Sequence, residues 1–121
     1  MSPESRDAAH LADMLRYARQ VVAFVDGVSL ERYRRDTMLR FAVERGIEII
    51  GEAANHVSGT TQAAHPGIRW RAIIAQRHVL AHGYNAIADE RIWRVATIEL
   101  PALIAQLGPL VPADLTSPPQ D

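Results

Sequence analysis

Hydrophobic residues recur at three- and four-residue spacing along most of the chain, which is the period of amphipathic α-helices. The first run predicts a helix over residues 5–26, which Gly27 ends, and Ser29 is placed to cap the next helix. Signals for β-strands are weak throughout. The apolar positions of this helix are Leu11, Met14, Leu15, Ala18, Val21, Val22 and Val25.

A second helix is predicted over residues 30–57, and it carries two apolar stripes. One stripe contains Tyr33, Met38, Phe41, Ile49 and Ala53, and the other contains Val43, Ile47, Ile50, Ala54 and Val57. A helix with two stripes is buried on two sides, and in so short a chain one side could be a subunit interface. Gly46 and Gly51 each cost about 1 kcal/mol relative to alanine inside a helix, so we expect close helix contacts there.

The rest of the chain predicts a loop over 58–67, a third helix over 68–82 ended by Gly83, and a fourth over 88–107. Pro101 should kink or split the fourth helix. Its inward-facing residues are Ile92, Ala96, Leu100, Leu103, Ile104 and Leu107. We therefore predict an all-α fold, an antiparallel bundle of four to five helices over residues 1–108, with a flexible C-terminal tail at 109–121.

Composition narrows the class of protein. The 121 residues suit one domain, and a hydrophobic content of 48% is enough to form a core. No stretch of about 18 apolar residues is present, so we expect no membrane span. The polar N-terminus is unlike a secretory signal. The absence of cysteine rules out disulfides and thiolate metal sites, and it is consistent with a cytoplasmic protein.

Charge is unevenly distributed along the chain. The net charge is −1, but residues 65–94 hold five arginines against Asp89 and Glu90, a local balance of +3. The remaining eight arginines and twelve acidic residues give −4. This basic segment also contains the residues with the most evident chemistry.

Arg77, His82 and Tyr84 form a cluster within eight residues, in the sequence RHVLAHGY. An arginine can neutralise a phosphate and stabilise charge in a transition state. A histidine can transfer protons near neutral pH. Because the 2′-hydroxyl of RNA is a built-in nucleophile, this pair can cleave RNA without a metal ion. A purely structural reading, with His82 as a helix cap and Tyr84 packed, is the alternative.

Helix geometry constrains how Arg77 and His82 act together. On a continuous helix they lie about 140° apart, with an axial rise of about 7.5 Å, so they do not share one face. Either the helix ends between them, or the site combines residues from two copies of the motif. The second option predicts a two-fold homodimer.

A metal site is the rival interpretation of this segment. His78 and His82 are four residues apart and share a helix face, so they could ligate a metal together with Glu52, His56 or His65. No HExxH pattern is present, and the spacing is common. We expect no metal and no cofactor.

Several segments in order resemble one known family. They are Ile49–Ala53 (IIGEA), His65–Arg71 (HPGIRWR), Arg77-x4-His82-Gly83-Tyr84 and Ile92-Trp93. Together they resemble the HepT-like branch of the HEPN superfamily over roughly residues 8–107. The motif Arg-x4-His-x-Tyr is fully present. One departure is His78, which stands where many relatives have asparagine after the motif arginine.

The resemblance implies a HEPN-like helical bundle that forms a homodimer, with paired Arg-x4-His motifs in a composite ribonuclease cleft. It implies the toxin of a type VII toxin–antitoxin pair, with RNA as substrate and a MntA-like minimal nucleotidyltransferase as antitoxin. That partner would add AMP units to Tyr84. The added negative charge beside Arg77 and His82 would repel substrate phosphate. Tyr84 is therefore expected to be a regulatory target.

Supporting roles are predicted for three further residues. Glu52 is expected to orient Arg77, since a carboxylate buried on a two-striped helix needs a partner. His78 is expected to replace a polar contact, although a second proton-transfer role is open, and Arg71 belongs to the basic surroundings. Trp70 and Trp93 are expected in the core, with base stacking by Trp70 as the alternative. The alternative function is a non-catalytic module that binds nucleotide or antitoxin.

Overall fold

A computed structural model of the chain describes residues 2–82 and 86–116, leaving the side chains of 3, 77–82, 86, 87 and 116 outside the description. The described part is helical without a strand, so the all-α prediction is confirmed. The longer helices are α1 (Pro3–Val25), α3 (Thr37–His56), α5 (Trp70–His82), α6 (Ala86–Arg94) and α7 (Leu100–Leu107). Short helices are α2 (Leu30–Arg35), α4 (Gly59–Ala64) and α8 (Ala113–Thr116).

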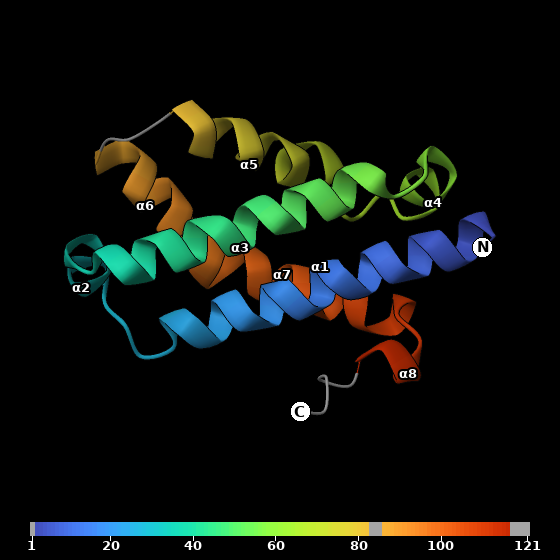
Figure 1. Cartoon of the computed structure of the whole chain (residues 1–121), viewed down its shortest axis with the longest axis horizontal. Coiled ribbons are helices and arrows are strands. Elements are labelled where there is room, and N and C mark those ends of the chain that lie inside the picture. Colours follow the sequence, from blue (N-terminus) through green and yellow to red (C-terminus); the bar gives the residue numbers. More distant parts are fainter. Residues whose placement is uncertain (1, 83–85, 117–121) are drawn as a thin grey trace.

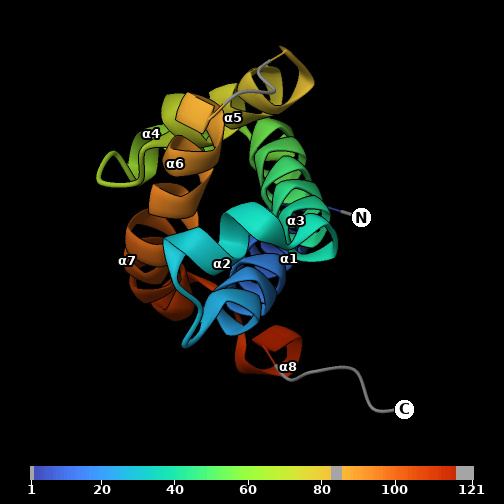
Figure 2. The same cartoon turned by 90° about the vertical axis from the view of Figure 1, so that its left-hand side faces the viewer.

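The long helices form an up-and-down bundle. α1 and α3 run side by side in opposite directions, and α5 returns along the other side of α3 (Figure 1). α6 begins near α2, and α7 then packs along α1. Figure 2 shows the bundle from the end where α2 lies. α3 is therefore the central element, with α1 on one flank and α5 on the other.

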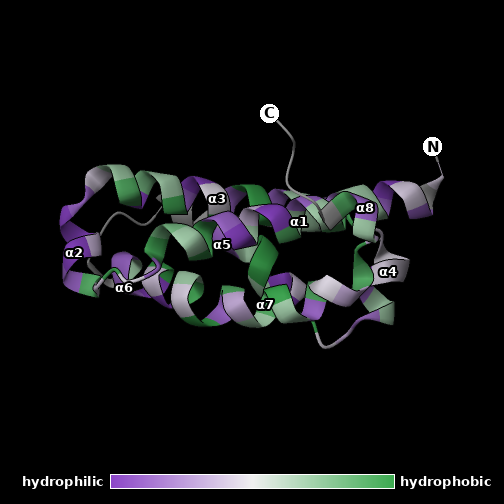
Figure 3. Ribbon diagram, turned by 90° about the horizontal axis from the view of Figure 1, so that it is seen from below, coloured by the Kyte–Doolittle hydropathy of each residue, from purple (hydrophilic) through white to green (hydrophobic). Residues whose placement is uncertain are grey.

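The core follows the predicted apolar stripes. The first helix buries all of its predicted apolar positions except Val22, which is half-buried. In α3 the stripe of Val43, Ile47, Ile50 and Ala54, continued by Val57, is entirely buried. Figure 3 shows the hydrophobic residues on the facing sides of the helices. The pattern alone therefore located the core.

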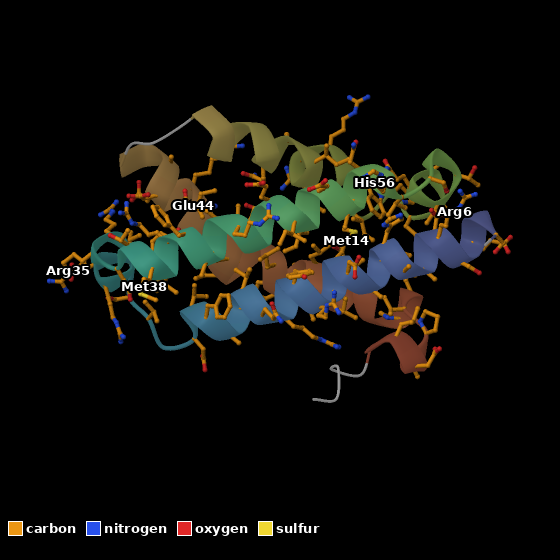
Figure 4. All side chains as sticks on the ribbon, in the orientation of Figure 1. Arg6, Met14, Arg35, Met38, Glu44 and His56 are labelled. Carbon is orange, nitrogen blue, oxygen red and sulfur yellow. The ribbon has the colours of Figure 1, made fainter. Side chains whose placement is uncertain are left out.

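The other predicted stripe is only partly buried. Tyr33 and Ala53 are buried, but Met38 is 84% exposed and Phe41 is 62% exposed. Figure 4 shows Met38 near the end of α3 that adjoins α2, directed away from the bundle. No helix in the described part of the chain covers Met38 and Phe41.

The predicted helix over 30–57 is two helices, which corrects that expectation. Asp36 has an extended backbone (φ −101°, ψ 96°), and its carboxylate accepts a hydrogen bond from the Leu39 amide at 3.0 Å. Aspartate is a favoured N-cap because its side chain satisfies an amide that has no partner in the first turn. The cap begins α3 at Thr37, and α2 ends at Arg35, one residue before the cap.

The segment predicted as a loop over 58–67 contains a short helix, α4, so that prediction was incomplete. Ser58 caps it by accepting from the Thr61 amide at 3.3 Å. The same turn is tied to α1, because Asp7 accepts hydrogen bonds from the Ser58 amide, the Ser58 hydroxyl and the Thr61 hydroxyl, at 2.9, 2.6 and 2.6 Å. These hydrogen bonds, together with coulombic attraction from His10, lower the pKa of Asp7 against the opposing effect of burial.

Pro101 divides the fourth predicted helix, as expected. A π-helical turn over Val95–Glu99 separates α6 from α7, with the Leu100 amide bonded to the Val95 carbonyl. Proline lacks the amide that an α-helix would need at this point, and its ring crowds the preceding turn. The Thr97 hydroxyl also donates to the Trp93 carbonyl at 2.7 Å, which favours a bend.

Folded structure continues past residue 108, where the sequence places the start of a flexible tail. A 3₁₀ turn spans Gly108–Leu110, Val111 is 7% exposed, and α8 follows. The apolar Val111 fixes this segment against the core, a signal that the Pro- and Asp-rich composition outweighed in the prediction. Residues 117–121 of the predicted tail lie outside the described residues. Within the described helices, none combines the length and apolarity that crossing a membrane requires.

Candidate active site

α5 carries the motif arginine and histidine, and its first turn is firmly anchored. Ile68 and Trp70 are buried, and the Trp70 indole donates to the His65 carbonyl at 3.0 Å. The Gln106 side chain, from α7, donates to the Gly67 carbonyl at 2.8 Å. The segment that precedes α5 is thus held on both sides, and Trp70 is a core residue as predicted.

The backbone of α5 is helical from Trp70 to His82 without a break. Arg77 and His82 therefore lie on one continuous helix, about 140° apart around its axis and about 7.5 Å apart along it. Of the two arrangements left open by the sequence, the one in which the helix ends between them does not occur. Their side chains lie outside the described part, as does that of His78.

Tyr84 and Gly83 lie outside the described residues, so neither the tyrosine predicted to be a regulatory target nor the predicted glycine cap is placed. The segment 83–85 joins α5 to α6, and both of its neighbouring helices are described. In the sequence Tyr84 follows His82 by two residues. The positions of α5 and α6 therefore locate the motif at the end of the bundle where α2 lies (Figure 1).

Two of the predicted supporting residues are exposed. Glu52, on α3, lines a surface hollow with His10 and Asp13 of α1 and with His56. Its burial, which was the reason to expect a pairing with Arg77, is absent. Arg71 lies on the exposed side of the first turn of α5, beside a shallow hollow lined by Trp70 and Gly59. A role of Glu52 or Arg71 beside Arg77 therefore stays a prediction.

A cluster of charged residues that sequence reasoning missed lies where α6 meets α2 and α3. Arg40 on α3 pairs with Asp89 on α6 at 3.6 Å, and Arg34 on α2 pairs with Glu90 at 3.7 Å. The Arg40 pair is the less exposed of the two, and the Arg40 Nε is buried without a hydrogen-bond partner among the described residues. These pairs fix the start of α6, immediately after the motif.

Burial perturbs two acids beside this cluster. Burial raises the pKa of Glu44, and Asp89 adds to the effect while Arg40 opposes it. Figure 4 shows Glu44 on the part of α3 below α5 and α6. Burial also raises the pKa of Tyr33, whose ring packs against Trp93 with centroids 5.1 Å apart. In the sequence, Arg40 and Glu44 showed an i, i+4 spacing that could have indicated a paired face.

A pocket of about 230 Å³ lies between α3, α5, the π turn and α7. Its walls are mostly apolar, and include Ile47 and Ile50 of α3, Ile73 of α5 and Leu103 of α7. Gln76 of α5, the residue before Arg77, also lines it and is 5% exposed. No signal in the sequence indicates this pocket, because each wall is part of an ordinary apolar stripe.

No group of histidine, cysteine, aspartate or glutamate side chains that could hold a metal ion occurs among the described residues. His56 stacks on His10 of α1 with ring centroids 5.3 Å apart, and Figure 4 shows it at the opposite end of α3 from Met38. His65 holds the Trp70 indole through its backbone carbonyl. The side chains of His78 and His82 lie outside the description.

Comparison with known proteins adds a family to this geometry. A family model described as "Ribonuclease HepT-like" matches residues 14–110, which include α5 and the whole motif. A protein of Caldanaerobacter subterraneus named as an RNase is 30% identical over 98 residues, covering 81% of this chain and 88% of the relative.

Two further relatives match the chain over similar lengths. One, of Methanocaldococcus jannaschii and also named as an RNase, is 28% identical over 95 residues, or 78% of this chain and 87% of the relative. The other, of Thermococcus cleftensis, bears the name ribonuclease HepT and is 29% identical over 94 residues, or 78% and 86%. No solved structure matches.

Proposed function

The chain belongs to the HepT-like ribonuclease family, and we propose that it is an RNA-cleaving toxin that acts through Arg77 and His82 without a metal ion. The observation that carries the proposal is the intact Arg-x4-His motif, on one uninterrupted helix of a family member. Relatives that bear RNase names support the substrate class.

The chemistry needs only these two side-chain types and the RNA itself. His82 accepts the proton of the 2′-hydroxyl, and the 2′-oxygen attacks the adjacent phosphorus. Arg77 stabilises the charge that develops on the non-bridging phosphate oxygens. The bond from phosphorus to the 5′-oxygen breaks, and that oxygen takes a proton from a water molecule, while the imidazolium of His82 returns its proton to the hydroxide that is left. The products are a 2′,3′-cyclic phosphate and a free 5′-hydroxyl.

The continuous helix favours a site built from two copies of the chain. With about 140° between them, Arg77 and His82 of one helix cannot both face one phosphate. In a two-fold dimer, Arg77 of one subunit faces His82 of the partner subunit, and each such pair forms one of two equivalent sites in a composite cleft. Exposed apolar residues such as Met38 and Phe41 leave surface for a subunit contact.

Regulation is proposed to act on Tyr84. A MntA-like nucleotidyltransferase, the antitoxin of a type VII pair, would transfer AMP to its hydroxyl with release of pyrophosphate from ATP. Tyr84 is two residues from His82 in the sequence, so the added phosphate would bring negative charge to the motif. That charge repels the substrate phosphate and pairs with the arginine that should bind it.

Cleavage of RNA by the purified chain in the presence of EDTA tests the proposed activity. We expect fragments that end in 2′,3′-cyclic phosphate, and a loss of about 10²–10⁴-fold in rate for His82→Ala. Arg77→Ala should lose activity to a similar extent. Arg91→Ala is the matched control, because it removes one exposed charge from the same basic segment outside the motif. An inactive wild-type protein, or one that needs Mg²⁺, would overturn the proposal in favour of a binding module.

Mixing the two inactive variants tests the composite site. Half of the dimers formed after mixing Arg77→Ala with His82→Ala contain one of each chain, and each such dimer has one intact cross-subunit pair. Activity should therefore recover to about a quarter of the wild-type rate. Recovery to less than a few per cent, with dimers present by light scattering, would show that Arg77 and His82 do not pair across subunits.

Mass spectrometry tests the regulatory step separately. Co-expression with a nucleotidyltransferase encoded beside this chain should add the mass of one or more AMP units, on a peptide that contains Tyr84. Tyr84→Phe should remain unmodified and active in the same cells. Unmodified wild-type protein under these conditions would remove the antitoxin from the proposal while leaving the ribonuclease activity intact.

A further inference from the structure

The pocket between α3, α5 and α7 is built in a way that distinguishes it from a packing defect. Its apolar walls come from three separate helices, and its rim carries Arg69 and Glu99. The bond from Gln106 to the Gly67 carbonyl holds one edge of the rim in place. A cavity of roughly 150 Å³ is known to accept a benzene ring. At about 230 Å³ this pocket has room for a two-ring base.

Gln76 gives the pocket a specific chemical requirement. Its side chain is 5% exposed, and its Oε1 has no hydrogen-bond partner among the described residues. Buried acceptors are almost always paired, because an unpaired one loses its bonds to water without compensation. The oxygen itself is buried, so the side-chain amide must rotate toward the pocket for an occupant that donates an N–H to satisfy it. An aliphatic group offers no donor. A phosphate would be repelled by the oxygen and would lose its hydration between the apolar walls.

The position of Gln76 connects the pocket to the proposed chemistry. Gln76 directly precedes Arg77 on the same helix, so their backbones are about 1.5 Å apart along its axis. At the rim, Arg69 makes no ion pair with a described residue and belongs to the basic segment. A flat, amino-bearing ring that carries a phosphate on its sugar fits this combination of an apolar slot, a buried acceptor and nearby cations.

We propose that this pocket holds a purine base of the RNA substrate, with the amino group of the base donating to Gln76 Oε1. The inference rests on the proposed function, which places the neighbouring phosphate at Arg77. Ile47, Ile50 and Leu103 contact the faces and edge of the base, and Arg69 contacts the backbone that leaves the pocket. The pocket thereby selects which nucleotide lies beside the bond that is cut.

Binding of RNA analogues that cannot be cleaved tests the pocket apart from catalysis. The probes are fluorescein-labelled hexanucleotides of 2′-O-methyl uridine, because methylation blocks the nucleophile. Their third position is 2′-O-methyl adenosine, its analogue without the amino group (purine riboside), or uridine. By fluorescence anisotropy the wild-type protein should bind the adenosine probe about 3- to 10-fold more tightly than the purine riboside probe. The uridine probe should bind most weakly.

Two variants assign the preference to this pocket. Gln76→Leu keeps the approximate size of the side chain but removes the acceptor, so the adenosine and purine riboside probes should bind equally. Ala102→Phe fills the pocket from an exposed position of α7 and should abolish the preference for purines over uridine. Ala105→Phe is the matched control, since Ala105 is exposed on the same helix and does not line the pocket.

The outcomes separate the pocket from the ribonuclease proposal. Equal binding of all three probes by the wild type, or an unchanged preference in Gln76→Leu, would overturn the base site even if unmodified RNA is cleaved. The expected preferences without cleavage of unmodified RNA would support the base site and remove the catalytic role. Loss of the dimer in Ala102→Phe but not in Ala105→Phe, by light scattering, would mean that a second copy of the chain occupies the pocket, which also overturns the inference.

Discussion

The two flanks of α3 are packed differently. On the α1 flank the helices approach closely at Gly46, and the junction with α4 is closed by Asp7, whose carboxylate accepts three hydrogen bonds. On the α5 flank a pocket of about 230 Å³ remains, and the buried Gln76 lacks a partner for its oxygen. Among the described residues each flank buries one polar side chain, Asp7 on the α1 flank and Gln76 on the α5 flank, and only Asp7 is fully hydrogen-bonded.

This difference separates stability from function within one small bundle. A hydrogen-bond network in which every polar group is paired stabilises the folded state, and it offers a ligand no free donor or acceptor. An unpartnered buried acceptor costs stability, and such groups are rare in native proteins unless a catalytic role, a bound group or a water accounts for them. The α1 flank therefore holds the bundle together, while the α5 flank carries the proposed chemistry.

The largest effect is expected from Asp7→Ala. The substitution removes three hydrogen bonds to a buried carboxylate and leaves the Ser58 and Thr61 hydroxyls to find other partners. The free energy of unfolding should fall by about 2–3 kcal/mol. Urea unfolding followed by circular dichroism measures it. Asp13→Ala, at a half-exposed position of the same helix where the aspartate pairs only with Arg16 among the described contacts, should change it by less than about 0.5 kcal/mol. Equal effects would mean that the α1 flank does not depend on this network.

Acid should weaken the same flank progressively. The pKa of Asp7 is lowered in the folded state from its ordinary value of 3.8, so folding favours the ionised form. The stabilisation is therefore complete above the unfolded-state pKa and is lost as pH falls through the lower, folded-state pKa. Urea unfolding at several pH values should show a smaller acid-induced loss for Asp7→Asn than for the wild type. Parallel pH profiles for both proteins would contradict this role of Asp7.

The sequence predicted the α1 flank better than the α5 flank. The 3- and 4-residue periods of Leu11 to Val25 and of Val43 to Val57 located the core, because helix burial depends on local spacing. The break at Asp36 was not predicted, because an aspartate that caps a helix has the same hydropathy as one on the exposed face of a helix. Local pattern therefore described each helix but not how neighbouring helices meet.

The candidate site was recognised from residue types and spacing, which the sequence contains directly. Glu52 illustrates what the sequence does not contain. The exposure of Glu52 depends on how α1 and α3 pack, and these helices come from different parts of the chain. The Arg40–Asp89 pair joins residues 49 positions apart, and the pocket is formed by three helices. Such features arise only from tertiary packing, so no period in the sequence could indicate them.

Gly46→Ala should expose the close contact on the α1 flank, as the sequence predicted for this glycine. An added Cβ would collide with Val21 Cγ2, and overpacking of this kind costs about 1–3 kcal/mol. The better helix propensity of alanine returns about 1 kcal/mol, so a net loss is expected. Gly59→Ala, where a Cβ meets nothing within 4 Å, is the control and should not lose stability. The double variant Val21→Ala with Gly46→Ala should lose less free energy of unfolding than the sum of the two single losses. A loss equal to that sum would count against a direct contact.

The smallest effect on stability is expected from Gln76→Leu, the counterpart of Asp7→Ala on the α5 flank. Leucine fits the apolar walls and removes an acceptor that has no partner among the described residues. The free energy of unfolding should stay the same or rise by up to about 1 kcal/mol, because the desolvation cost of the oxygen disappears. Urea unfolding of the free protein, compared with the isosteric Gln76→Glu, measures this. Glutamate should destabilise the fold, since it buries a charge or forces protonation. A loss of more than about 1 kcal/mol in Gln76→Leu would show that Gln76 is a structural residue like Asp7, and the contrast between the two flanks would no longer hold.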